Sequence, residues 1–165
     1  MKFYIMAAVL LFVANVAQAQ NVNLYTEEDH PQAYCMALNI YYEARGSNLA
    51  DRVGTADVVL NRVQDTRYPN TICEVVKQGR QHPSGAMMRN QCQFSWYCDG
   101  KNDRPQNDDL WIDAQMLAFQ IVHEGKYRGI TEGATHYHAT YVKPRWASTL
   151  QLVGRIGAHI FYRWE

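Results

Sequence analysis

The chain has 165 residues, of which 47% are hydrophobic and 12% aromatic. This length allows one domain with a substantial core and is too short to favour two. Sixteen basic residues balance sixteen acidic ones, so the net charge gives no reason to expect nucleic acid or an anionic membrane as a partner. We therefore expect one monomeric domain that acts on a neutral or zwitterionic partner.

The first residues are organised as a secretory signal peptide. Lys2 precedes an apolar run that ends near Ala14, and the triplet AQA ending at Ala19 has small residues where a cleavage site requires them. The run is shorter than the roughly 20 residues that span a bilayer, which argues against a membrane anchor. The chain thus divides into a predicted signal peptide over 1–19, a polar lead over 20–32 and a folded domain over 33–165, and we expect the mature protein in the periplasm or outside the cell.

Export to an oxidising compartment favours disulfides over free thiols. Four cysteines, Cys35, Cys73, Cys92 and Cys98, allow three pairings. Cys92 and Cys98 bracket the short loop CQFSWYC, so we expect these two to pair, which leaves Cys35 with Cys73 by default. The other pairings stay open from the sequence alone.

The first predicted helix covers about 31–45. Pro31 suits the first turn, where its missing N–H is no loss, and apolar residues then recur at helical spacing. Gly46 provides a left-handed stop. Glu43 consequently projects from the last turn, near the negative end of the helix dipole, where a cation would be more favourable.

The second predicted helix, about 48–64, is apolar around most of its circumference, as a buried helix is. Gly54, Asp57 and Asn61 nevertheless form a polar strip along it. We expect that strip to line a cleft.

Further along, Thr71 and Glu74 have the spacing of a capping box, which predicts a short helix that ends at Gly79. The segment 80–106 shows no strong periodicity, so we expect a long ordered loop that serves a site. An amphipathic pattern then predicts a helix over about 108–124.

The last forty residues contain THYHATYV and AHIFYRW, whose aromatic and β-branched residues are typical of short strands. The order of elements predicts an α+β fold that is mainly helical, with a small sheet or hairpin toward the C-terminus.

Glu43 is the first candidate for chemistry. Desolvation beside Tyr41 and Tyr42, together with the helix dipole, should raise the pKa of this carboxyl group. A glutamic acid that stays protonated near neutral pH is what glycoside cleavage needs, because the leaving sugar oxygen must receive a proton. The alternative is that Glu43 forms an ion pair with Arg45 or another base.

Two other segments offer groups that bind sugars. The loop QFSWYCDG, residues 93–100, combines an amide, a hydroxyl and aromatic faces, although Phe94 and Trp96 could instead be core residues, which we favour for Phe94. Downstream, a short extended region could form the opposite wall of a groove with His136, Tyr137, His138, Tyr141 and Trp146.

Six motifs occur in the order in which one known family has them: IYYEARG, VVLNRV, YPNTICEVV, CQFSWYCDG, ATHYHATYVKPRWA and IGAHIFYR. Across residues 33–163 the chain resembles the cell-wall hydrolase family that includes the spore-cortex-lytic enzymes. The resemblance implies a lysozyme-like fold related to the lytic transglycosylases, with residues 33–165 as the catalytic domain. Ser47 departs from the family pattern, which often has a second glutamate there.

The resemblance also implies site residues. Glu43, in the EARG motif, would be the catalytic acid, Asn61 would occupy a cleft position, and Gln93, Ser95 and Tyr137 would line the groove. We add Trp96 and His138 as candidates for substrate binding, and we expect no metal or other cofactor.

The predicted activity is cleavage of the bond from N-acetylmuramic acid to N-acetylglucosamine in peptidoglycan strands. Hydrolysis normally uses two carboxylates, and Asp57, Asp99 and Glu132 are weaker candidates for a second one. A lytic transglycosylase needs only Glu43, which would act first as acid and then as base. Hydrolysis by a muramidase or glucosaminidase is the alternative.

Two further alternatives belong to other classes. His136 and His138, with His123 or His159, could bind zinc for amide hydrolysis, although none of the zinc-protease spacings occurs. A wall-binding module without activity is the other, but such a module has no need for an acid at a helix end. The sequence fits a bacterial wall-remodelling enzyme and a phage endolysin equally well.

Overall fold

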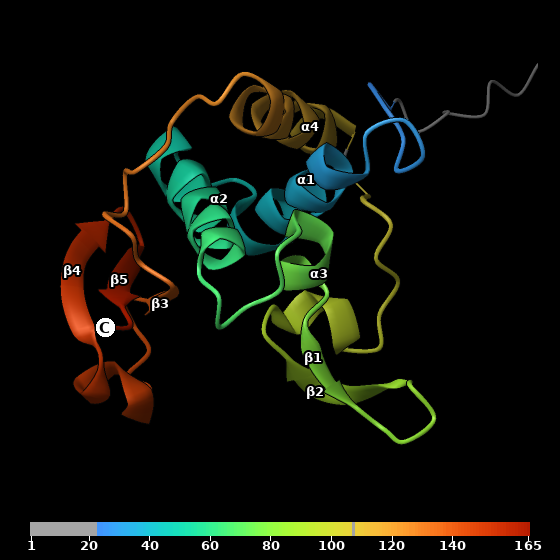
Figure 1. Cartoon of the computed structure of the whole chain (residues 1–165). Coiled ribbons are helices and arrows are strands. Elements are labelled where there is room, and N and C mark those ends of the chain that lie inside the picture. Colours follow the sequence, from blue (N-terminus) through green and yellow to red (C-terminus); the bar gives the residue numbers. More distant parts are fainter. Residues whose placement is uncertain (1–22, 107) are drawn as a thin grey trace, which may run out of the picture.

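The computed structural model describes residues 23–106 and 108–165, and the predicted signal peptide lies outside this part of the chain. Within the described part, four α-helices form the body of the molecule (Figure 1). They are α1 (Pro31–Ala44), α2 (Leu49–Gln64), α3 (Ile72–Val76) and α4 (Asp108–His123). The bounds of α1, α2 and α4 agree with the predicted ranges within one residue, whereas α3 ends three residues before the predicted stop at Gly79.

Capping residues explain why the helices begin where they do. The side chain of Asn48 accepts a hydrogen bond from the backbone N–H of Asp51 at the start of α2, and Thr71 does the same for Glu74 at the start of α3. After α1 the chain reverses at Gly46, whose φ of 77° is costly for other residues. The last turn of α1, with Glu43, is thereby fixed in place.

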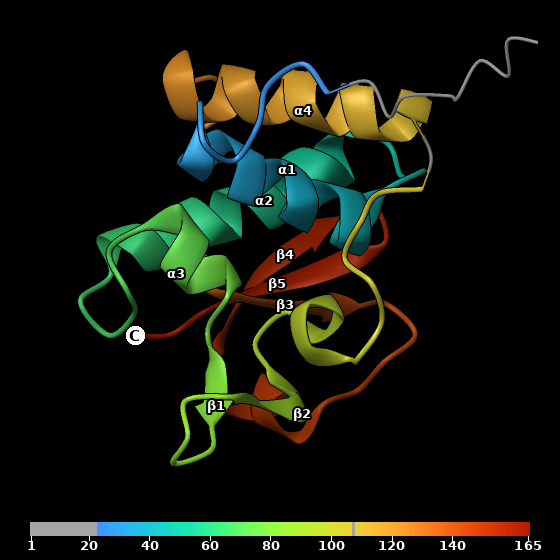
Figure 2. The ribbon, with the colours of Figure 1, turned by 90° about the vertical axis from the view of Figure 1, so that its right-hand side faces the viewer.

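Helix α1 is the centre of the helical layer and contacts α2, α3 and α4. Figure 2 shows α4 lying across its outer side, with α2 behind it. The main core lies between these helices and includes Met36, Ile40, Val59 and Trp111. Burial on nearly all sides of α1 explains how the helix can hold a carboxylate near its end away from bulk water.

The C-terminal residues form a three-stranded antiparallel sheet beside α2 (Figure 1). Its strands are β3 (His136–Ala139), β4 (Gln151–Ile156) and β5 (His159–Arg163), in the order β3-β5-β4. Phe161 of β5 is fully buried in a second, smaller cluster with Val58 and Ala134. A Cβ atom on Gly54 would lie 2.8 Å from the Phe161 ring, so the glycine permits this close contact between α2 and the sheet. The predicted α+β, mainly helical fold class is confirmed.

The segment expected to be an irregular loop contains a hairpin and a helical turn. Strands β1 (Gly79–Gln81) and β2 (Met87–Cys92) pair in antiparallel fashion, and a 3-10 helix follows over Ser95–Cys98. Most of the hairpin residues are exposed. Because these strands are mostly exposed, their sequence lacks the alternating apolar pattern from which a strand is predicted.

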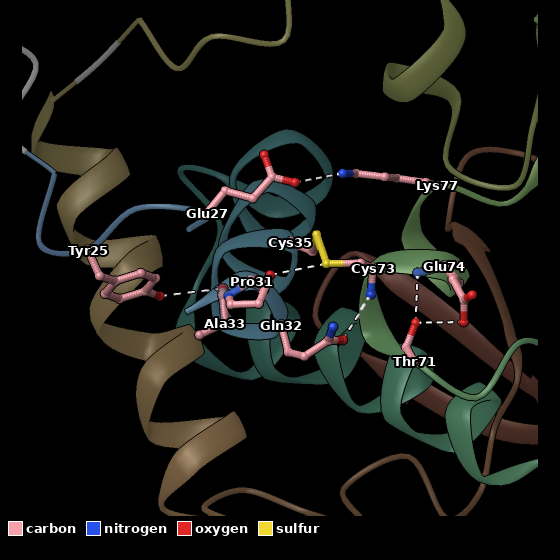
Figure 3. The surroundings of a disulfide bond; sticks show 10 residues. All are labelled: Tyr25, Glu27, Pro31, Gln32, Ala33, Cys35, Thr71, Cys73, Glu74 and Lys77. Carbon is pink, nitrogen blue, oxygen red and sulfur yellow. Dashed lines mark hydrogen bonds and ion pairs between the residues drawn. A yellow bond between two sulfur atoms is a disulfide. The ribbon is translucent and has the colours of Figure 1, made fainter. Parts of the chain in front are cut away.

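Both expected disulfides are present. Cys35–Cys73 joins α1 to α3 (Figure 3), and Cys92–Cys98 closes the loop that follows β2. Beside the first disulfide, the Gln32 side chain accepts a hydrogen bond from the backbone N–H of Cys73. The α1–α3 junction is therefore fixed both covalently and by hydrogen bonding.

Two members of the polar strip of α2, Gly54 and Asp57, do not line an open cleft, contrary to expectation. Asp57 is 1% exposed and accepts hydrogen bonds from Arg128, from the Gly129 N–H and from both the N–H and the hydroxyl of Thr131. Asn61 donates to the Thr131 hydroxyl and to the Ala134 carbonyl. The strip thus fixes the segment between α4 and β3.

The polar lead packs on α4. Tyr25 is buried, and its hydroxyl donates to the Gln115 carbonyl oxygen at 2.8 Å, while the Gln115 amide donates to the Tyr25 carbonyl. Among the helices of the described residues, none has the length and apolar character needed to cross a membrane.

Candidate active site

A polar hollow of about 240 Å³ lies where the two helices α1 and α2, the loop after β2 and the C-terminal segment meet. It is called the Glu43 hollow below. Its lining residues are Glu43, Arg62, Gln93, Phe94, Ser95, His136, Tyr137 and Trp146. Segments that are far apart in the sequence thus contribute to one site.

Glu43 enters the hollow from the last turn of α1 and is partly buried. Its Oε2 atom accepts a hydrogen bond of 2.9 Å from the Tyr137 hydroxyl. Burial raises the pKa of Glu43, while the Tyr137 hydrogen bond and the charges of His159 and Arg62 oppose that rise without cancelling it. A larger share of this carboxyl group is therefore protonated near neutral pH than of an exposed glutamate.

Glu43 forms no ion pair among the described residues, contrary to the alternative in which Arg45 neutralises it. The Arg45 guanidinium instead lies over the rings of Tyr41 and Tyr42, at 4.9 and 5.8 Å from their centroids. Among the described residues, no directly paired cation therefore favours the ionised form of Glu43.

Tyr137 is held so that its hydroxyl points at Glu43. Its ring packs against His159 at 5.2 Å and Phe161 at 5.7 Å, between centroids. Burial, and then the charge and hydrogen bond of Glu43, raise the pKa of Tyr137 well above its usual value. The phenol therefore stays protonated and remains a donor to Glu43.

Arg62 was not among the predicted site residues. Only 5% of the Arg62 surface is exposed. Its Nε donates to the Thr135 carbonyl at 2.8 Å. The guanidinium also lies over the rings of Tyr68 and Phe94. Burial lowers the pKa of Arg62, and the nearby Glu43 charge opposes that shift. A cation within the VVLNRV motif, on a helix expected to be buried, was the available signal.

Gln93 and Ser95 lie on the loop that the Cys92–Cys98 disulfide closes, and both are exposed in the hollow. The Gln93 N–H also donates to the Gln78 carbonyl at 2.9 Å, which fixes the start of the loop. Phe94 is 2% exposed, so it is mainly a core residue, as expected. The two polar side chains are free to meet a ligand while the ring between them anchors the loop.

Three of the predicted substrate-binding residues lie outside the Glu43 hollow. Trp96 is 7% exposed and stacks on Tyr42 at 4.8 Å, so it packs in the core and does not line the hollow. His138 stacks on Tyr162 instead, with Nε2 3.1 Å from the tyrosine hydroxyl. Asn61 lies on a different surface of α2, where it contacts the segment before β3.

The opposite wall of the hollow comes from His136 and Trp146, whose rings are 5.3 Å apart. Tyr141, the remaining aromatic candidate, is 89% exposed and does not line the hollow. Burial, followed by the charges of Arg62 and Arg67, lowers the pKa of His136 to about 4. This ring is consequently neutral at neutral pH and offers a hydrogen-bonding nitrogen.

Glu43 is the one carboxylate among the residues that line the hollow. The candidates for a second acid lie elsewhere: Asp57 is buried against Arg128, Asp99 pairs with Lys101, and Glu132 is exposed in the turn before β3. The site therefore offers one proton donor from a carboxylic acid.

The histidines of the zinc alternative are dispersed. His123 packs against His30 and Phe119, whereas the His159 Nδ1 donates to Asp51. Within the described residues, no group of three or more histidine, cysteine or acidic side chains is arranged to hold a metal ion.

Comparisons with known proteins give a consistent result. The chain matches two solved structures: the catalytic domain of a germination-specific lytic transglycosylase, SleB, from Bacillus anthracis, and the catalytic domain of the Bacillus cereus SleB protein. The first has 26% identity and a TM-score of 0.59, with 86% of this chain and 99% of that chain covered. The second has 24% identity and a TM-score of 0.56, with 89% and 99% covered, and it supports the fold alone.

No curated protein matches the chain in sequence. The family model described as Cell Wall Hydrolase does match, over residues 46–162, which is more than half of the chain. This match begins just after Glu43, so that residue lies outside the matched range. The chain belongs to the Cell Wall Hydrolase family.

Proposed function

We propose that the protein cleaves peptidoglycan glycan strands as a lytic transglycosylase, at the bond from N-acetylmuramic acid to N-acetylglucosamine. The observation that supports this most is Glu43 itself, a partly buried carboxyl group with a raised pKa that is the one acid in a polar hollow. Family membership supports the same reaction, as does the named activity of the Bacillus anthracis neighbour.

In the first half of the reaction, protonated Glu43 donates its proton to the glycosidic oxygen. The bond from that oxygen to C1 of the muramic acid breaks, and positive charge develops on the sugar ring. Glu43 becomes a carboxylate at this point. The Tyr137 hydrogen bond and the Arg62 charge stabilise that anion, because both favour the ionised form.

In the second half, the Glu43 carboxylate removes the proton from the C6 hydroxyl of the same muramic acid, and O6 attacks C1. The product is a 1,6-anhydro sugar, and Glu43 is protonated again. Because one side chain gives and then takes a proton, no second carboxylate is required, and the hollow offers none.

The walls of the hollow would hold the substrate. Gln93 and Ser95 would bind N-acetyl groups and hydroxyls, since an amide and a hydroxyl can both donate and accept. Trp146 would offer a ring face to a sugar beside His136. Trp96 and His138 have no part in this proposal, since they lie outside the hollow.

Product analysis tests the reaction type. Purified sacculi are digested with the protein, and the soluble fragments are examined by mass spectrometry. The proposal expects fragments that end in 1,6-anhydro-muramic acid. Fragments that carry water at the reducing end, without anhydro species, would establish hydrolysis instead, and release of free stem peptides from intact strands would establish an amidase.

We further propose that the chain reaches its substrate by export, with cleavage after Ala19. N-terminal sequencing of the protein recovered from the periplasm or medium should then begin at Gln20. A protein that retains Met1 and stays in the cytoplasm would contradict this.

A further inference from the structure

We propose that the protein has a second saccharide-binding subsite, centred on Trp164, which binds a neutral N-acetylhexosamine of the same glycan strand beyond the Glu43 hollow. This proposal rests on the proposed function, because it concerns a distant part of the same substrate. The subsite is a shallow hollow of about 240 Å³, called the distal hollow below. It is lined by Asn61, Gln64, Asp65, Arg67, Gly133, Thr135, Arg163 and Trp164.

The two hollows are connected by a row of aromatic rings. The His136 ring lies 5.3 Å from that of Trp146, in the Glu43 hollow, and 6.1 Å from that of Trp164, in the distal hollow. Thr135 lines the distal hollow, and its hydroxyl is 3.0 Å from His136 Nδ1. A strand that leaves the Glu43 hollow along this wall therefore meets a further aromatic side chain.

Trp164 is both accessible and held in position. It is 46% exposed, although it belongs to the residue type that is usually largely covered. The Arg67 guanidinium lies 4.5 Å from its ring centroid and donates to the backbone carbonyls of Trp164 and Glu165. Cation–π contact on one side and fixed backbone leave a preorganised indole, which is the kind of platform that sugars bind.

The charges of the distal hollow favour a neutral ligand over an anionic one. Arg67 pairs with Asp65 at 2.7 Å, and Arg163 pairs with Glu165 at 2.8 Å. Each cation is thus already balanced by a carboxylate, so an acidic stem peptide gains little by binding here. The charge pattern supports an N-acetylhexosamine as the occupant.

Asn61 supplies a polar group for such a sugar. Its amide nitrogen donates to Thr131 and to the Ala134 carbonyl, which fixes the orientation of the side chain. Its Oδ1 accepts no hydrogen bond from the described residues and remains available to a sugar amide or hydroxyl. The cleft role expected for Asn61 is thereby moved from the Glu43 hollow to the distal hollow.

The test compares substrates of two lengths. Peptide-free glycan substrates, one a disaccharide and one a dodecasaccharide, are digested by the wild type and by Trp164→Ala. Short strands that fill the Glu43 hollow gain little from Trp164. The ratio of kcat/KM for long strands to kcat/KM for short strands should therefore fall about three- to ten-fold in the variant, because KM for the long strands rises. Trp164→Phe, which keeps a ring, should restore most of the ratio.

Tyr127→Ala is the matched control, because Tyr127 is also an exposed aromatic residue, 44% exposed, and lies in neither hollow. It should leave the ratio unchanged. If Trp164→Ala lowers kcat/KM equally for both lengths, Trp164 has a structural role only, and the proposal is wrong. The same holds if the ratio changes only for strands that retain their peptides.

A binding measurement separates this proposal from the proposed function. Calorimetric titration of peptide-free dodecasaccharide into Glu43→Gln and into Glu43→Gln with Trp164→Ala requires no cleavage. Weaker binding by the double variant supports the distal subsite even if the wild type proves to release other products. Equal binding by the two proteins overturns the subsite and leaves the chemistry at Glu43 untouched.

Discussion

Glu43 experiences two opposing influences, and their balance decides its chemistry. Partial burial favours the neutral acid, whereas the Tyr137 hydrogen bond and the charges of His159 and Arg62 favour the carboxylate. An acid that also serves as a base must reach both states during one turnover. Opposing influences of this kind keep either state within reach.

Tyr137→Phe tests this balance. The change removes the hydroxyl that stabilises ionised Glu43, so the pKa of Glu43 should rise further and the alkaline limb of the kcat/KM profile should move to higher pH. Loss of one hydrogen bond to a charged group should also lower kcat/KM by about ten-fold. The measurement is a pH profile of strand cleavage. A lower rate with an unmoved alkaline limb would show that Tyr137 only supports the fold.

The two disulfides differ in what they hold together. Cys92–Cys98 encloses three residues of the Glu43 hollow. Cys35–Cys73 instead joins α1 to α3 (Figure 3), and neither of these cysteines lines the hollow. Cys92 and Cys98 are 6 positions apart in the sequence, and Cys35 and Cys73 are 38 positions apart. One disulfide therefore organises the site, and the other organises the helical layer.

Serine pairs at these positions should separate activity from stability. Chain entropy predicts a loss of about 2 kcal/mol for Cys92→Ser with Cys98→Ser, and about 4 kcal/mol for Cys35→Ser with Cys73→Ser. At a temperature where both variants are folded, the first should lose more kcat/KM, because Gln93 and Ser95 are no longer held. Urea denaturation and strand cleavage measure the two quantities. The reverse order of activity loss would show that the loop needs no covalent closure.

At the scale of the whole molecule, the raised pKa of Glu43 implies a cost in stability. The folded protein binds the Glu43 proton more tightly than the unfolded chain does, so the free energy of unfolding must decrease as pH rises from the unfolded pKa to the folded one. Below the unfolded pKa both states are protonated, and the cost disappears. Above the folded pKa the cost is fully present.

Glu43→Gln should therefore gain stability relative to the wild type as the pH rises. The free energy of unfolding of the variant minus that of the wild type should be larger at neutral pH than at acidic pH. Glutamine keeps the shape and the hydrogen-bonding oxygen but does not titrate. Urea denaturation of both proteins across this pH range gives the comparison. A stability difference that does not change with pH would mean that the pKa of Glu43 is the same in the folded and unfolded states.

The elements of the fold that could be predicted from the sequence are those that depend on local signals. The helices followed from apolar periodicity and from Pro31, Gly46 and Thr71, whose effects act within a few residues. The hairpin β1–β2 could not be predicted, because its strands are short and mostly exposed, so their pairing leaves no pattern.

Four residues proposed from the motifs, Glu43, Gln93, Ser95 and Tyr137, are brought together in one hollow by the fold. Trp96 lies outside it, because a tryptophan beside a site can face the core, and here it stacks on Tyr42. Arg62 was overlooked because its proximity to Glu43 depends on how α1 and α2 pack. Proximity between residues of two different helices cannot be inferred from their spacing along the sequence.

The proposed reaction depends above all on Glu43, which we propose supplies the proton that breaks the glycan strand. The most direct test is the rate at which wild-type protein and Glu43→Gln solubilise purified sacculi, with circular dichroism to show that both are folded. We expect a rate lower by about 10²- to 10⁴-fold for the variant, the usual contribution of a general acid. A folded Glu43→Gln protein that solubilises sacculi as fast as the wild type would contradict it.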